Sequence, residues 1–124
     1  MMAKPMTDAE IETMAETLRV LGHGVRLRLL ETLSMRGEMA VGELEMVTGV
    51  GQPGLSQQLA ILRKAEMVNT RRAAKQVYYS LTADALKAAA QLVGRLAGLS
   101  AQAVAPRAAR SVKRGSAVVF PKIL

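Results

Sequence analysis

Apolar residues in the first part of the chain recur three and four positions apart, which is the spacing of one helical face. Thr7 and Glu10 form the sequence of a capping box, so a first helix is expected to begin at Thr7. A second helix is expected from about Val25 to Met35, after the interruption Gly22-His23-Gly24. The apolar stripe of the first helix consists of Ile11, Met14, Ala15, Leu18 and Leu21.

A short third helix and a glycine-marked turn follow. The helix is expected from Val41 to Thr48, with Val41, Leu44 and Val47 buried. The turn is Gly49-Val50-Gly51, because glycine adopts positive φ angles without steric cost.

The fourth helix has an unusual division of faces. It is expected to begin near Pro53, whose missing N–H costs nothing in a first helical turn. One face carries leucines only, at positions 55, 59 and 62. The opposite side carries Pro53, Gln57, the small Ala60 and Lys64, and Ser56 lies beside it, so this face can approach another surface closely.

Two β-prone runs complete the pattern, Val68–Arg72 and Val77–Leu81, with residues 73–76 between them as the tip of a hairpin. Thr82 is expected to cap a fifth helix that extends to about Leu99. The order α-α-α-α-β-β-α predicts a mainly α fold with a small β-hairpin, a winged helix-turn-helix. The expected division is a flexible N-terminus (1–6), the winged helix-turn-helix domain (7–100) and a basic, then apolar, tail (101–124).

Charge is distributed unevenly along the chain, whose net charge is +7. Residues 1–50 carry five Lys/Arg against eight Asp/Glu, whereas residues 51–124 carry twelve against two. A basic face that follows phosphates accounts for this separation, and nucleic acid is the expected partner.

Composition excludes several classes of chemistry. The chain has no cysteine and one histidine, His23, which excludes disulfides, thiolate nucleophiles and multi-histidine metal sites. We expect no metal, no cofactor and no catalytic residue. No apolar run approaches the ~20 residues of a membrane span, so a cytoplasmic protein with no membrane partner is expected.

Three stretches together resemble the ArsR/SmtB family of bacterial winged-helix repressors: LRVLGHGVRLRLLETL, VGELEMVTGVGQPGLSQQLAILRKAEMV and TRRAAKQVYYSL. The resemblance covers roughly residues 11–99. It implies a homodimer through the first and fifth helices, a palindromic DNA operator, and release when an inducer binds. The implied dimer contacts are Ile11, Met14, Leu18, Leu86, Ala90, Val93, Leu96 and Ala97.

The sensing motifs of the family are missing. Metal-responsive members carry cysteines in the third helix, where this chain has VGELEMVTG, and others place ligands along the fifth helix, where only Asp84 remains. Persulfide-responsive members use a cysteine in the second helix, whose position Glu31 occupies, and one in the fifth. The expected inducer is therefore neither a Cys/His-bound metal nor a thiol oxidant.

The chemistry of the side chains divides the expected DNA contacts into two groups. Glutamine can hydrogen-bond adenine with both amide atoms, and serine serves a base or a phosphate. The expected base contacts are Gln52, Ser56, Gln57 and Gln58. The expected phosphate or minor-groove contacts are Arg63, Lys64, Arg71, Arg72, Lys75 and Gln76.

These patterns predict a sequence-specific transcriptional repressor that binds DNA as a homodimer. Two alternatives stay open: a regulator that responds to a small organic ligand, and an architectural protein that coats DNA without sequence preference. An enzyme is not expected, because the chain has neither a phosphate-binding glycine motif nor a carboxylate cluster.

Overall fold

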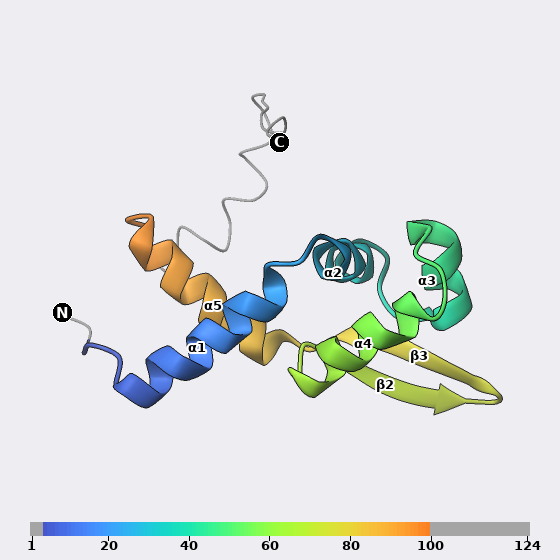
Figure 1. Cartoon of the computed structure of the whole chain (residues 1–124), viewed down its shortest axis with the longest axis horizontal. Helices are drawn as coiled ribbons and strands as arrows, with labels where there is room; N and C mark the ends of the chain where they lie inside the picture. The colour runs from blue at the N-terminus through green and yellow to red at the C-terminus, as the bar shows by residue number, and fades with distance from the viewer. Residues whose placement is uncertain (1–3, 100–124) are drawn as a thin grey trace, which may run out of the picture. The chain divides into compact units, whose positions relative to one another are not determined.

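A computed structural model describes residues 4–99 of the 124-residue chain (Figure 1). The expectations for residues 1–3 and 100–124, including the basic and apolar tail, lie outside these residues. The chain divides into two units, one up to Ala89 and one from Ala90 onward. The elements are α1 (Asp8–Leu21), α2 (Gly24–Arg36), β1 (Met39–Ala40), α3 (Val41–Thr48), α4 (Gly54–Lys64), β2 (Val68–Ala73), β3 (Gln76–Leu81) and α5 (Ala83–Leu96).

The capping box at the start of α1 is confirmed. The Glu10 backbone N–H donates to Thr7 Oγ1 at 3.1 Å, and the Thr7 N–H donates to Glu10 Oε1 at 2.9 Å. Two backbone donors that the helix cannot pair internally are satisfied in this way. The predicted beginning of α1 follows directly from these two side chains.

Leucine side chains from α2, α3 and α4 form the core of the first unit. Leu29, Leu44, Leu55, Leu59 and Leu62 are completely inaccessible to solvent. Burying one leucine in this way contributes about 1.5–3 kcal/mol. The leucine face predicted for α4 therefore holds that helix against the core and leaves its other face outward.

The sheet contains a strand that the sequence pattern did not predict. Its order is β1-β3-β2, and β1 pairs with β3 through Met39 opposite Tyr79 and Ala40 opposite Tyr78. Because β1 has two residues, it carries no alternation of apolar and polar positions. It joins the chain before α3 to the hairpin, and all neighbouring strands are antiparallel.

The hairpin tip is shorter than predicted. Ala73 pairs with Gln76, so the expected four-residue tip is wrong and only Ala74 and Lys75 lie between the strands. Ala74 has a φ of 56°, in the left-handed region that favours glycine. Gln76 belongs to β3 rather than to the tip.

α4 begins at Gly54, directly after Pro53, which agrees with the expected beginning near Pro53. Two further expectations are corrected. Val47, in the last turn of α3, is 42% exposed, although it lies three positions after the buried Leu44 and on the same side of the helix. The Thr82 hydroxyl caps nothing, because its buried Oγ1 has no hydrogen-bond partner.

Helix lengths differ slightly from the expected ones. α2 is one residue longer at each end, and α5 ends at Leu96 rather than near Leu99. None of the helices within residues 4–99 is long and apolar enough to cross a membrane.

Candidate nucleic-acid interface

The turn between α3 and α4 is fixed by backbone and side-chain hydrogen bonds. Gly49 ends α3 with a φ of 77°, and its N–H donates to the Glu45 carbonyl oxygen at 2.9 Å. The Thr48 hydroxyl donates to the Leu44 carbonyl at 2.6 Å and accepts from the Val50 N–H at 3.2 Å. This turn sets the angle at which α4 leaves α3.

The outward face of α4 carries uncharged polar side chains. Ser56 and Gln57 are exposed in its first turn, and Ala60 is exposed one turn later. Gln52 precedes the helix and accepts a hydrogen bond through Oε1 from the Ser56 N–H at 3.0 Å. The Gln52 side chain thus occupies a free donor at the N-terminus of α4, with its amide nitrogen still available.

Gln58 lies apart from the other three expected base contacts. It is half-buried, and its Oε1 accepts a hydrogen bond from Arg26 Nε at 2.9 Å. Arg26 also donates through a terminal nitrogen to the Val20 carbonyl at 3.2 Å. Gln58 therefore anchors α4 to α2 and to the end of α1, and its role as a base contact stays a prediction.

Arg71 is held by a partner that the sequence pattern did not identify. It donates to both carboxylate oxygens of Glu38, at 2.9 and 2.7 Å, and its guanidinium carbon lies 4.9 Å from the centre of the Tyr78 ring. Hydrogen bonding from Arg71 holds the pKa of Glu38 below its ordinary value, and the same bonds raise the pKa of Arg71. The pair ties β2 to the loop before β1.

The remaining expected phosphate contacts are exposed. Arg72 follows Arg71 along β2, so its side chain lies on the other face of the hairpin. Lys75 lies at the tip and Gln76 at the start of β3, whereas Arg63 and Lys64 form the last turn of α4. These side chains lie on two elements, the end of α4 and the hairpin formed by β2 and β3. We call this hairpin the wing.

The expected dimer contacts differ in exposure. On α1, Ile11 and Leu18 are 51% and 37% exposed, whereas Met14 is buried. On α5, Leu86 packs against the core of the first unit, and Val93 and Leu96 are 50% and 76% exposed. Ala90 and Ala97 are also exposed. Each helix therefore has apolar side chains available to a second molecule.

Two structural residues, Arg26 and Glu38, were missed from the sequence. Their partners are 32 and 33 positions away, at Gln58 and Arg71. No local periodicity reports a contact over such a distance.

Comparison with known proteins identifies the class of this fold and site. Residues 23–70 match the family described as bacterial regulatory protein, arsR family. The Biofilm growth-associated repressor of Xylella fastidiosa is 52% identical over 82 residues, which are 66% of this chain and 68% of that protein.

Solved structures agree with this match. The transcriptional repressor BigR from Xylella fastidiosa is 48% identical and gives a TM-score of 0.58, covering 73% of this chain and 86% of that chain. NolR from Sinorhizobium fredii is 33% identical with a TM-score of 0.60, covering 79% and 100%.

The fold and its exposed helix therefore define a winged helix-turn-helix transcription regulator. The chain belongs to the ArsR family, and it is a DNA-binding transcriptional repressor. The expected fold class and the expected general function are both confirmed.

Proposed function

We propose that the chain binds a palindromic operator as a homodimer, with one α4 helix in each of two successive major grooves. The observation that carries this proposal is the outward face of α4, which is exposed, polar and uncharged before its last turn. Such a face favours base contacts over solvation alone. Two-fold symmetry then requires half-sites about one helical turn apart.

The helix α4 and the wing make different contacts with DNA. Gln52, Ser56 and Gln57 contact bases, while Arg63 and Lys64 contact phosphates at the other end of α4. Arg72, Lys75 and Gln76 of the wing contact phosphates or a flanking minor groove. Arg71 contributes mainly by fixing the wing through Glu38, because its guanidinium already makes a bidentate pair.

The repressor acts without catalysis, and its release requires a chemistry other than the family's best-known ones. The full sequence has no cysteine and one histidine, so thiol oxidation and a Cys/His-bound metal cannot be the signal. A small organic inducer fits this composition.

The test is selection of binding sites from a random duplex library with the full chain, followed by footprinting. A two-fold symmetric consensus is expected. Gln57→Ala should cost about 1–3 kcal/mol of binding free energy at the base that Gln57 contacts. Arg72→Ala should weaken binding to all DNA sequences alike, and it should reduce the slope of log affinity against log salt concentration by about 1.

Matched controls separate these effects from general loss of surface groups. Gln91→Ala and Arg28→Ala remove an exposed glutamine from α5 and an exposed arginine from α2. Neither should change the selected sequence or the salt dependence of DNA binding. Equal affinity for the selected site and for random DNA would instead favour a coating protein.

A further inference from the structure

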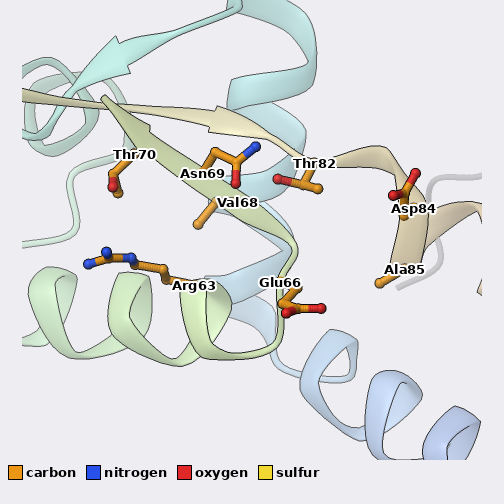
Figure 2. A pocket seen from close by; sticks show the side chains of 8 residues that line it. All are labelled: Arg63, Glu66, Val68, Asn69, Thr70, Thr82, Asp84 and Ala85. Atoms are coloured by element: carbon orange, nitrogen blue, oxygen red, sulfur yellow. The ribbon is translucent and has the colours of Figure 1, made fainter. Parts of the chain in front are cut away.

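A polar cavity of about 440 Å³ lies where the end of α4, the strand β2 and the start of α5 meet (Figure 2). All of its lining residues belong to the first unit. Charged and polar side chains dominate the lining: Arg63, Glu66, Asn69, Thr70, Thr82 and Asp84. A cavity of this size accommodates a small metabolite.

Backbone hydrogen bonds give the cavity a fixed frame. After α4, Glu66 adopts a φ of 60° and its N–H donates to the Arg63 carbonyl at 2.9 Å. The N–H of Met67 donates to the Leu62 carbonyl at 2.9 Å, and the N–H of Thr82 donates to the Met67 carbonyl at 3.0 Å. Met67 is fully buried in the core, so its two backbone hydrogen bonds attach the end of α4 and the start of α5 to the core beneath the cavity.

Opposite charges lie at opposite ends of the cavity. Figure 2 shows Arg63 extending toward Thr70, whereas Glu66 and Asp84 lie at the other end beside Ala85. Within residues 4–99 the salt bridges are Arg19–Glu16 and Arg71–Glu38, and neither includes a residue of the cavity. These three charges are therefore available to a ligand.

The wall of the cavity also contains an unsatisfied hydroxyl. Thr82 Oγ1 is shielded from solvent and has no hydrogen-bond partner in the described part of the chain. In Figure 2 this hydroxyl points toward Asn69. Buried polar groups are normally paired, so an unpaired one beside a cavity favours a ligand that reaches it.

We propose that this cavity binds a small basic amino acid, in which the carboxylate and the side-chain cation are several bonds apart. The carboxylate pairs with Arg63 at one end of the cavity, and the side-chain cation pairs with Glu66 and Asp84 at the other end. The cavity residues carry a net charge of −1 and such a ligand carries +1. A simple anion would face two carboxylates, and a simple cation would leave Arg63 unpaired.

The ligand acts as an inducer, and this part rests on the proposed DNA contact of Arg63. A guanidinium that is paired with the ligand carboxylate is withdrawn from the phosphate that it otherwise contacts. Binding of ligand and of operator are then mutually weakening by the same factor.

Calorimetry on the full chain without DNA tests the site. L-lysine is expected to bind, whereas L-norleucine, which lacks the side-chain ammonium, and cadaverine, which lacks the carboxylate, should each bind at least about tenfold more weakly. No heat from L-lysine, L-ornithine or L-arginine at millimolar concentration, or equal binding of the two control compounds, would overturn the proposal.

Variants locate the ligand. Asp84→Asn, Glu66→Gln and Arg63→Gln should each weaken L-lysine binding about tenfold, whereas Glu31→Gln, an exposed carboxylate of α2, should not. Circular dichroism checks that each variant folds, and any one folded cavity variant is sufficient. Unchanged binding in a folded variant contradicts the assignment.

Operator binding with and without L-lysine tests the inducer role separately. A fall in operator affinity with L-lysine but not with L-norleucine supports the inducer role. Unchanged operator affinity overturns the inducer role but does not contradict ligand binding in the cavity. A chain that selects no operator at all contradicts the proposed function, and calorimetry still decides the site.

Discussion

Ala74 at the tip of the wing holds a conformation that costs an L-residue free energy. Its φ of 56° places Cβ near the neighbouring carbonyl oxygen, and glycine has no such contact. Ala74→Gly is therefore expected to raise the free energy of unfolding by about 1 kcal/mol. Urea denaturation monitored by circular dichroism measures the change.

The neighbouring residue provides the control. Ala73 is the last residue of β2 and pairs with Gln76, so glycine there should lower the free energy of unfolding by about 0.5–1 kcal/mol. If both substitutions lower it, the left-handed conformation of Ala74 is not a source of strain.

The wing as an element depends on the pair Glu38–Arg71. Because the pKa of Glu38 is lowered in the folded chain, ionised Glu38 stabilises the wing above the pKa of the unfolded state, about 4.3. That contribution is lost as pH falls through the lower folded pKa. Glu38→Gln should therefore reduce hydrogen-exchange protection of the hairpin amides at neutral pH.

In acid the wild type and Glu38→Gln should converge, since protonated Glu38 no longer accepts both hydrogen bonds. Glu45→Gln on α3 is the matched control, because Glu45 forms no side-chain hydrogen bond or salt bridge within residues 4–99. A difference between wild type and Glu38→Gln that is independent of pH would argue against the pair.

Elements defined by local chemistry were predictable from sequence. α3 lies at the predicted residues, Val41–Thr48, because a glycine that adopts positive φ ends it. The capping box defines α1 in the same local way. By contrast, β1 forms only by pairing with Tyr78 and Tyr79, almost forty positions further along the chain.

In the candidate site, too, only features that depend on local sequence were predictable. Ser56 and Gln57 were placed on the exposed face by the leucine spacing of α4, which is a local property. The engagement of Gln58 by Arg26 and of Arg71 by Glu38 depends on how distant elements pack. The cavity beside Thr82 likewise combines three elements and has no sequence signature.

The proposed homodimer can be tested through the oligomeric state of the protein. Leu96 on α5 is 76% exposed, so a carboxylate there would be buried without a partner in the proposed interface. Leu96→Glu should give a monomer in analytical ultracentrifugation and weaken operator binding at least about tenfold. Met46→Glu on α3 changes an equally exposed apolar residue, at 83%, and should leave the oligomeric state as it is.

The outer strand of the wing has a consequence for the protein in the absence of DNA. β2 has β3 as its one strand neighbour within residues 4–99, so its other edge can accept a further strand. An open edge invites pairing between copies and aggregation, which like charges oppose. We expect the like charges of Arg72 in β2 and Lys75 at the tip to repel each other between molecules, and so to oppose edge-to-edge pairing of the unbound repressor.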